Sequence, residues 1–176
     1  YFEEIEAFRY RHEPFIHCFV QFTRWHMRRV LEVGVGGGTD FLQFVRAGAL
    51  ASGVDLTQEA IDNVSARLNV MGLKAERLER CNAETLPFED GMFDLVYSWG
   101  VIHHAADMEA VLREIYRVTR PGGRVKLMVY HLWSPHAVYM YVRYALLRGR
   151  FFPGPRLPLP SAVLEDEAAV LAHRGD

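Results

Sequence analysis

The sequence predicts an α/β fold with a doubly wound, mainly parallel sheet and helices on both faces. Between residues 29 and 130, five short apolar segments alternate with segments of helical periodicity, and a glycine-rich turn follows the first of them. Such alternation is typical of parallel strands joined by right-handed helical crossovers. The predicted strands are residues 29–33, 51–56, 78–81, 93–98 and 124–130.

The turn after the first strand, within the stretch RVLEVGVGGGTD, leaves the backbone bare of side chains. It contains the glycines Gly34, Gly36, Gly37 and Gly38. Either Thr39 or Asp40 is expected to cap the following helix, whose apolar residues pack back onto the strand. A strand, a glycine turn and a helix predict a nucleotide-type ligand, although glycines in a turn also occur for packing alone.

The later helices carry recognisable boundaries. Thr57 is the predicted N-cap of a crossover helix, and Gly72 lies where that helix should end. Asp107 is expected to begin a further helix with an apolar stripe, and the sequence Pro121-Gly122-Gly123 is expected to stop it.

The spacing of the glycine turn excludes two common nucleotide motifs. The dinucleotide fingerprint requires glycine at position 39, where this chain has Thr39. The phosphate-loop pattern requires a lysine, and none precedes Lys74. What remains is Glu32, two positions before Gly34, in the pattern Glu-x-Gly-x-Gly-x-Gly, which resembles motif I of the Rossmann-like (class I) S-adenosylmethionine-dependent methyltransferases. A carboxylate suits a ligand that carries an ammonium and a sulfonium group, and it would repel a pyrophosphate.

A second acidic residue supports a nucleoside ligand. Asp55 ends the second predicted strand and follows Gly34 by 21 positions. A carboxylate at that spacing lies at the carboxyl end of the neighbouring parallel strand, where it can accept hydrogen bonds from a ribose diol. Asp55 and Leu56 are therefore predicted cofactor-binding residues, and the alternative for Asp55 is a surface aspartate that begins a loop.

The segment Asn82-Ala83-Glu84-Thr85-Leu86-Pro87-Phe88 resembles the methyltransferase consensus Asp-Ala-Glu-x-Leu-Pro-Phe. The resemblance implies that residue 82 meets the exocyclic amine of adenine and that the next backbone N–H meets a ring nitrogen. Asn82 replaces the aspartate, and its amide oxygen can still accept from the amine. Asn82 and Ala83 are thus predicted cofactor contacts, with a plain turn as the alternative.

The fourth strand and its exit, FDLVYSWGVIHH, match the family segment F-D-x-V…V-x-H-H. The resemblance implies that the backbone near Ser98 and Trp99 approaches the methionine part of the cofactor. His103 and His104 are candidate proton acceptors near neutral pH, and the alternative is that they fix the shape of the loop. With RVTRPGGRV, the resemblance spans roughly 100 residues and is closest in type to the ubiquinone/menaquinone-biosynthesis and small-molecule methyltransferases.

Composition limits the class of protein. The chain has 176 residues, 50% of them hydrophobic, which suffices for one domain with a core. A net charge of −2 gives no electrostatic footprint for nucleic acid. The two cysteines, Cys18 and Cys81, suggest neither a disulfide framework nor a zinc site, so a reducing, cytoplasmic location is expected. The first residue is Tyr1 rather than methionine, so the sequence is expected to begin inside a longer chain.

Three segments are predicted. Residues 1–28 form an N-terminal helical cap with two short helices on either side of Pro14, and residues 29–130 form the cofactor-binding core. Residues 131–176 contain an aromatic helix, a proline-rich linker and a terminal helix. The apolar run from 137 to 147 is too short to span a membrane. The antiparallel hairpin that usually completes such folds is not evident, so the ending is either truncated or replaced.

The resemblance implies an enzyme that transfers the sulfonium methyl of S-adenosylmethionine to a small-molecule acceptor by direct in-line displacement. The sulfonium carries its own activation, so no metal is expected. The alternative from another class is a non-catalytic S-adenosylmethionine-binding or regulatory module of the same fold. An NAD-dependent oxidoreductase is disfavoured by Thr39. The sequence leaves the acceptor and the oligomeric state open.

Overall fold

The computed structural model describes residues 2–129, 138–139 and 142–143. The chain divides into two units, Tyr1–Val129 and Tyr130–Asp176. In the second unit, residues 138–139 and 142–143 are helical. The rest of the predicted aromatic helix, the proline-rich linker and the terminal helix lie outside the described residues.

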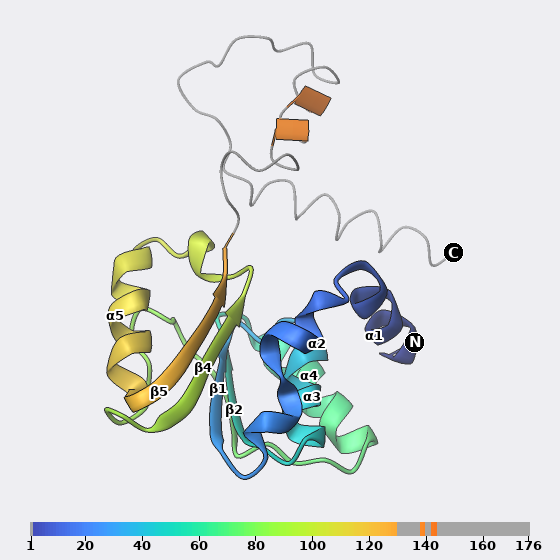
Figure 1. The fold of residues 1–176 in the computed structure, drawn as a ribbon, viewed down its shortest axis with the longest axis horizontal. Helices are drawn as coiled ribbons and strands as arrows, with labels where there is room; N and C mark the ends of the chain where they lie inside the picture. The colour runs from blue at the N-terminus through green and yellow to red at the C-terminus, as the bar shows by residue number, and fades with distance from the viewer. Residues whose placement is uncertain (1, 130–137, 140–141, 144–176) are drawn as a thin grey trace. The chain divides into compact units, whose positions relative to one another are not determined.

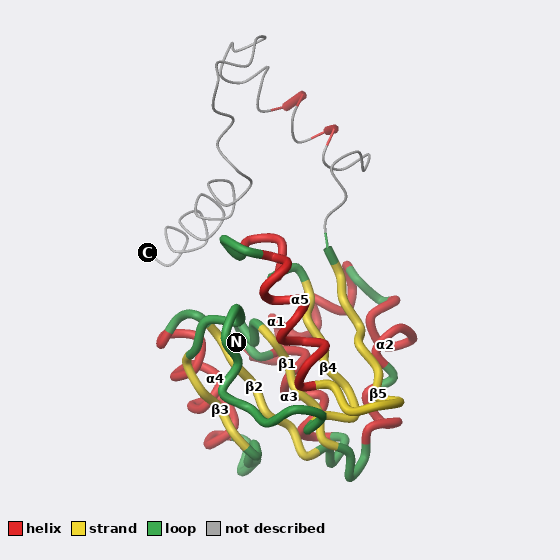
Figure 2. The backbone as a smooth tube through the Cα atoms, turned by 90° about the vertical axis from the view of Figure 1, so that its left-hand side faces the viewer, coloured by secondary structure: helices red, strands yellow, loops and turns green. Residues whose placement is uncertain are grey.

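Five parallel strands form the sheet at the centre of the first unit, which confirms the predicted fold class. Their order across the sheet is β3-β2-β1-β4-β5 (Figure 2), and every neighbouring pair is parallel. The strands are β1 (Arg29–Val33), β2 (Leu50–Asp55), β3 (Arg77–Arg80), β4 (Phe93–Trp99) and β5 (Thr119–Met128).

The strand order places a crevice at the carboxyl end of β1. The chain winds from β1 toward β2 and β3, and then crosses back to add β4 and β5 on the other side of β1. In open sheets of this kind, ligands bind outside the carboxyl ends of the strands where the winding direction reverses. The crevice between β1 and β4 is therefore the expected ligand position.

Helices cover both faces of the sheet, as Figure 1 shows. One face packs against α3 (Thr39–Arg46) and α4 (Gln58–Val70), and the other against α5 (Met108–Val118). The buried residues form a first core cluster on the side of α3 and α4 and a second on the side of α5. Strand β4 contributes to both, because successive side chains of a strand point to opposite faces: Leu95 and Tyr97 belong to the first core cluster, and Val96 belongs to the second. All three side chains are fully buried.

The N-terminal segment contains the two predicted helices, α1 (Phe2–His12) and α2 (Phe15–Val20), followed by a 3₁₀ turn, η1 (Phe22–Trp25). The indole N–H of Trp25 donates to the carbonyl of Val20 at 3.0 Å, and both residues lie in the first core cluster. The segment is thus packed against the sheet up to the start of β1.

Two of the predicted helix caps are confirmed. The side-chain oxygens of Thr57 and Asp107 accept hydrogen bonds from the backbone N–H groups of Ala60 and Ala110, which stabilises the starts of α4 and α5. Gly72 follows α4 with a φ of +63°, the left-handed conformation usual just after a helix.

The prediction that Thr39 or Asp40 caps α3 is wrong. The N-cap is Gly38, and no side chain completes a capping hydrogen bond there. Thr39 and Asp40 are both buried in the first turn of the helix instead.

The boundary between α5 and β5 also differs from the prediction. The helix ends at Val118, and the strand begins at Thr119 rather than at residue 124, so the helix stops before it reaches Pro121. Thr119 is paired with Phe93, and the register shifts between Phe93 and Leu95. Proline is tolerated here because β5 lies at the edge of the five-stranded sheet.

Within the part of the chain that the structure describes, the helices lack the combination of length and hydrophobicity that a membrane span requires.

Phe41 provides a test of the packing between α3 and the sheet, because its side chain is fully buried. We expect Phe41→Ala to lower the free energy of unfolding by about 3–5 kcal/mol through the cavity it leaves. Tyr116→Ala, at a side chain that is 83% exposed, should change it by about 0.5 kcal/mol or less. Urea unfolding of both variants measures the difference, and equal losses would contradict the packing described here.

Candidate functional site

A pocket of about 200 Å³ opens at the carboxyl end of β1, where the topology predicts a ligand. The pocket contains five of the predicted site residues together with residues that the sequence did not single out. Its lining is Arg9, Glu32, Gly34, Val35, Gly36, Gly37, Gly38, Thr39, Asp40, Trp99 and Val101.

The glycines of the turn have two different roles. A Cβ atom at Gly34 would lie 2.4 Å from a methyl group of Val101, and one at Gly38 would lie 2.6 Å from a methyl group of Val64. Both positions also have positive φ, so packing and backbone conformation require glycine there. At Gly36 and Gly37 a Cβ would meet nothing within 4 Å. These two positions border open space, as expected for backbone that a ligand approaches.

Glu32 is a buried acidic residue in the pocket lining. Its side chain is 4% exposed, it lines the pocket, and its Oε2 atom has no hydrogen-bond partner among the described residues. Burial, followed by the nearby charges of Asp40 and Asp55, raises the pKa of Glu32 well above its usual range, while Arg9 opposes the shift. A buried acceptor without a partner is costly. A cationic group in the pocket would supply the missing partner.

Asp40 is the centre of a buried hydrogen-bond network. Its carboxylate accepts from Nε of Arg9 at 3.0 Å, from Nη2 of Arg9 at 2.6 Å, from the hydroxyl of Tyr10 at 2.9 Å and from the hydroxyl of Tyr97 at 2.7 Å. These four bonds use the full acceptor capacity of a carboxylate. Burial, followed by the charge of Asp40, raises the pKa values of both tyrosines. The network joins α1, the start of α3 and β4.

Arg9 brings the N-terminal helix to the pocket. Besides its bidentate pairing with Asp40, its guanidinium group donates from Nη1 to Oε2 of Glu13 at 3.0 Å and lies 5.9 Å from the centre of the Trp99 ring. Sequence reasoning missed Arg9 and the true role of Asp40. The two residues are 31 positions apart, and an aspartate at the start of a helix most simply indicates a cap.

The glycine turn is held from two sides. One oxygen of Asp55 accepts from the backbone N–H of Gly36 at 3.0 Å, and the other accepts from the N–H and the hydroxyl of Thr57 at 3.0 and 2.9 Å. From α4, the buried guanidinium group of Arg67 donates to the carbonyl of Gly37. Asp55 therefore lies beside the pocket and also anchors the turn.

The other predicted cofactor residues lie outside the pocket lining. Leu56 is 65% exposed at the end of β2, and Ala83 packs against the second core cluster. Asn82 forms a local turn, because its side-chain oxygen accepts from the N–H of Glu84 at 3.0 Å. Ser98 is fully buried, and its hydroxyl donates to the carbonyl of Val33 at 2.8 Å, which ties β4 to β1 next to the turn.

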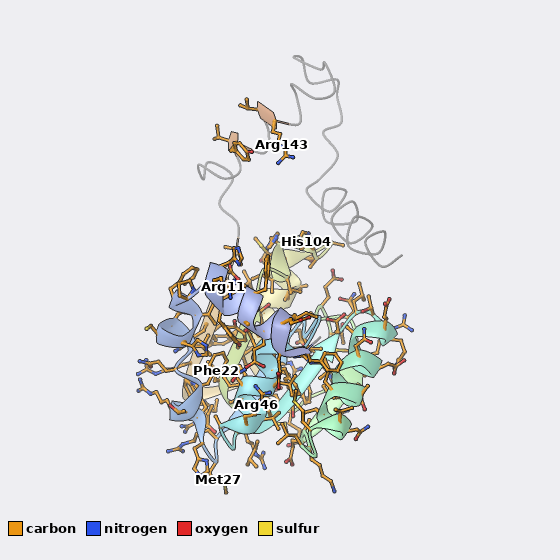
Figure 3. The ribbon with its side chains drawn as sticks, turned by 90° about the vertical axis from the view of Figure 1, so that its right-hand side faces the viewer. Arg11, Phe22, Met27, Arg46, His104 and Arg143 are labelled. Atoms are coloured by element: carbon orange, nitrogen blue, oxygen red, sulfur yellow. The ribbon has the colours of Figure 1, made fainter. Side chains whose placement is uncertain are left out.

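His103 and His104 form the short 3₁₀ turn η2 (Ile102–His104) directly after Val101, which lines the pocket. Their ring centres are 4.1 Å apart. His103 is half-buried, whereas His104 is exposed at the carboxyl end of the sheet, opposite Met27 (Figure 3). Burial, followed by the charge of His104, lowers the pKa of His103, so its ring is a neutral proton acceptor near pH 7.

Comparison with known proteins identifies the class of the chain. Residues 31–127 match the family described as "Methyltransferase domain", and the chain belongs to this family. Membership implies S-adenosylmethionine as the cofactor, in agreement with the resemblance in the sequence motifs.

Among individual relatives, an uncharacterized methyltransferase of Bacillus subtilis, YcgJ, is 34% identical over 100 residues, which are 57% of this chain and 40% of that protein. An uncharacterized Mycobacterium tuberculosis protein, Rv1405c, is 34% identical over 148 residues, which are 84% of this chain and 52% of the relative. The chain thus spans about half the length of the curated relatives it matches. The crystal structure of YcgJ superposes with a TM-score of 0.64 at 26% identity, covering 74% of this chain and 56% of that one.

The fold alone does not fix the reaction. The [4+2]-cyclase SpnF has the same fold, with a TM-score of 0.58 at 22% identity over 63% of this chain and 43% of that one. Function must therefore be argued from the residues of the site.

The pocket fits the amino-acid end of S-adenosylmethionine. The unpartnered Oε2 of Glu32 is a ready acceptor for an ammonium group, and Arg9 offers a cation on the same pocket for a carboxylate. Gly36 and Gly37 leave room for a ligand against the backbone. Among the described residues, no three histidine, cysteine, aspartate or glutamate side chains are grouped to hold a metal ion.

Gly37 and Gly38 form a matched pair that separates the two roles of the turn. We expect Gly38→Ala to destabilise the protein by about 2–4 kcal/mol, because the new methyl group meets Val64 and the backbone has a φ of +74°. Gly37→Ala should change stability by about 0.5 kcal/mol or less and weaken S-adenosylmethionine binding by about tenfold or more.

Thermal unfolding and calorimetric titration of the two variants give both quantities. Normal cofactor affinity in Gly37→Ala would show that the ligand does not lie against this part of the turn.

Proposed function

We propose that the chain binds S-adenosylmethionine in this pocket and transfers its methyl group to a small-molecule acceptor by direct in-line displacement. The observation that carries the proposal is the buried, unpartnered carboxylate of Glu32, which faces a pocket bordered by bare backbone at Gly36 and Gly37. That combination suits a ligand with a positively charged group and a close approach to the main chain.

The amino-acid end of the cofactor is proposed to lie between Glu32 and Arg9. Glu32 would accept from the ammonium group, and Arg9 would donate to the carboxylate. Arg9 is pre-positioned for this task because Asp40 holds its guanidinium group through two hydrogen bonds. Ordering Arg9 in advance lowers the entropic cost of binding.

The nucleoside end is proposed to extend past the turn toward β2 and the segment after β3. Asp55 would accept from the ribose hydroxyls, using capacity left over from its bonds to Gly36 and Thr57. Leu56, Asn82 and Ala83 follow the carboxyl ends of β2 and β3, where they would border the adenine. The backbone at Ser98 and Trp99 would approach the methionine part.

When bound, the cofactor supplies a methyl group on a positively charged sulfur, which needs no further activation. The residues of the chain then have to align the acceptor and exclude water, and alignment alone can be worth about 7–11 kcal/mol. His103 would take the proton from an acceptor hydroxyl, because its lowered pKa keeps it neutral and Val101, two residues before it, lines the pocket.

A small acceptor with apolar surface suits the wall beside the pocket. The ring of Trp99 lies 5.7 Å from that of Phe15 and 5.8 Å from that of Phe19, and both phenylalanines on α2 are exposed. These three aromatic rings would give a planar or aliphatic acceptor an apolar surface next to the reacting methyl group.

Calorimetric titration with S-adenosylmethionine and S-adenosylhomocysteine, with NAD as the control, tests the cofactor assignment. We expect binding of the first two only. Methyl transfer is then tested by product formation from a panel of hydroxylated, amine and carbon acceptors. Binding without transfer to any acceptor would favour a non-catalytic cofactor-binding module, and binding of NAD alone would overturn the proposal.

Glu32→Gln should separate binding from stability. The raised pKa of Glu32 means that its contribution to stability is present at low pH and is lost as pH rises through that pKa. We therefore expect the variant to be more stable than the parent by about 1–3 kcal/mol at neutral pH, with the difference vanishing under acid conditions. Its affinity for S-adenosylmethionine should fall by about tenfold to a hundredfold.

The difference in stability between Glu32→Gln and the parent is measured by unfolding midpoints over a pH series from acid to neutral. Glu59→Gln, at an exposed carboxylate, is the control. A loss of stability in Glu32→Gln at neutral pH would show that the carboxylate has a structural partner.

His103→Ala should lower turnover of a hydroxylated acceptor by about 10²–10⁴-fold while leaving cofactor affinity nearly unchanged. His104→Ala should have a much smaller effect on turnover, because that ring is exposed. Turnover of the parent should fall as pH drops through the lowered pKa of His103, below the ordinary value of about 6.5.

The charge of His104 contributes to the lowered pKa of His103. His104→Ala removes that charge, so the inflection in the pH dependence of turnover should move to higher pH. Single-turnover rates over a pH series measure both effects, and similar rates in the parent and His103→Ala would exclude His103 as the base.

A further inference from the structure

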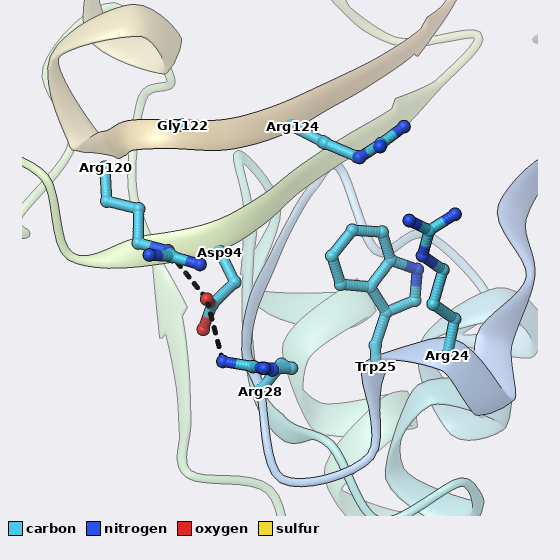
Figure 4. Close-up of a pocket in the computed structure, with 7 residues that line it drawn as sticks. All are labelled: Arg24, Trp25, Arg28, Asp94, Arg120, Gly122 and Arg124. Atoms are coloured by element: carbon cyan, nitrogen blue, oxygen red, sulfur yellow. Dashed lines mark ion pairs between the residues drawn. The ribbon is translucent and has the colours of Figure 1, made fainter.

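A second pocket, of about 190 Å³, lies at the opposite end of the strands, where β1, β4 and β5 begin (Figure 4). We call it the amino-end pocket. Four arginines from two distant parts of the chain converge on it. Its lining is Arg24, Trp25, Arg28, Asp94, Arg120, Gly122 and Arg124.

In one half of this pocket, a carboxylate pairs with two of the arginines. Asp94 pairs with Nε of Arg120 at 2.7 Å and with Nη1 of Arg28 at 3.8 Å, and its other oxygen accepts from the backbone N–H of Arg29 at 2.9 Å. Figure 4 shows these ion pairs on one side of the pocket. Among the described residues, Asp94 is the only carboxylate in the lining, and both of its oxygens already have partners.

The other half holds positive charge without a counter-ion. Among the described residues, Arg24 forms its side-chain hydrogen bond with the neutral amide of Gln21, at 3.2 Å, and Arg124 has neither an ion pair nor a side-chain hydrogen bond. In Figure 4 the Arg124 side chain runs above the Trp25 indole and the Arg24 side chain lies to its right.

A third cation lies next to them. Lys126 donates to the carbonyl of Val20 at 2.9 Å, and its ammonium group is 5.7 Å from the Trp25 ring. Burial, followed by the charges of Arg24 and Arg124, lowers the pKa of Lys126. The positive charges of Arg24, Arg124 and Lys126 oppose one another, and an anion between the two guanidinium groups would offset this repulsion.

We propose that this pocket binds a small phosphate-bearing anion between the guanidinium groups of Arg24 and Arg124. Guanidinium groups present planar pairs of N–H donors that match phosphate oxygens, and they remain charged at all physiological pH values. A volume of about 190 Å³ has room for a phosphate or diphosphate group. The net charge of −2 gives no broad positive field that would attract a long polyanion.

The anion site does not depend on the proposed methyl transfer, because the two pockets share no lining residue. Loss of the anion site should leave S-adenosylmethionine affinity unchanged. Failure of either proposal can thus be recognised separately.

Calorimetric titration of the full chain with inorganic phosphate and with pyrophosphate, at constant ionic strength set by sodium chloride, tests the proposal. We expect saturable binding of one equivalent, tighter for pyrophosphate. Arg24→Gln and Arg124→Gln should each weaken it by about tenfold or more. Lys74→Gln removes the same charge from an exposed loop and should leave it unchanged. Far-ultraviolet circular dichroism and unfolding midpoints check that all three variants are folded.

Three results would overturn the proposal. The first is the absence of saturable binding to either anion in the folded parent. The second is an equal loss in Lys74→Gln, which would indicate only a general effect of charge. The third is binding of duplex nucleic acid or anionic vesicles without binding of the small anions, which would make this pocket part of a macromolecular interface.

Discussion

The fourfold hydrogen bonding of Asp40 is the constraint on which the site depends. Its carboxylate lies in the first turn of α3, close to the glycine turn, and it holds Arg9 and Tyr10 of α1 and Tyr97 of β4. Without these donors, a buried carboxylate at this position would be strongly destabilising. The N-terminal segment is thus tied to the core by a specific polar contact as well as by apolar packing, and the same contact fixes the cation that borders the pocket.

The pockets at the two ends of the sheet are lined by ionisable groups of opposite kinds. At the carboxyl end, the carboxyl groups of Glu32 and Asp40 are buried near one guanidinium group, that of Arg9, so acidic groups outnumber basic ones in the pocket lining. At the amino end, Asp94 faces four arginines, and positive charge is in excess. Both imbalances lie in pockets lined by groups that could bind an ion of the opposite sign, while the remaining ion pairs of the described unit are mostly exposed and local.

Local patterns in the sequence were enough to predict the sheet and most of its helices. Alternating apolar segments located all five strands, and Thr57 and Asp107 located two helix starts, because capping depends on residues only three positions apart. The start of β5 was misplaced, since Pro121-Gly122-Gly123 was expected to stop the preceding helix, whereas an edge position accommodates these residues within the strand.

The polar contacts that build the site were harder to predict because they join distant parts of the chain. Glu32 and the glycines were found from their spacing, whereas Arg9 reaches Asp40 across 31 positions and Tyr97 reaches it across 57. No local pattern distinguishes a buried aspartate with four donors from one that caps a helix. The amino-end pocket was missed for the same reason, because Arg24 and Arg124 come together only through the fold.

The glycines of the turn serve either packing or ligand access, and this difference has an evolutionary consequence. Gly34 and Gly38 are required by the protein's own side chains, Val101 and Val64, so selection for folding alone would retain them. Gly37 has no such neighbour. In a lineage that abandoned its ligand, position 37 would be free to drift while positions 34 and 38 stayed fixed. The glycine that contributes least to the fold is therefore the one whose retention says most about whether a descendant still uses the pocket.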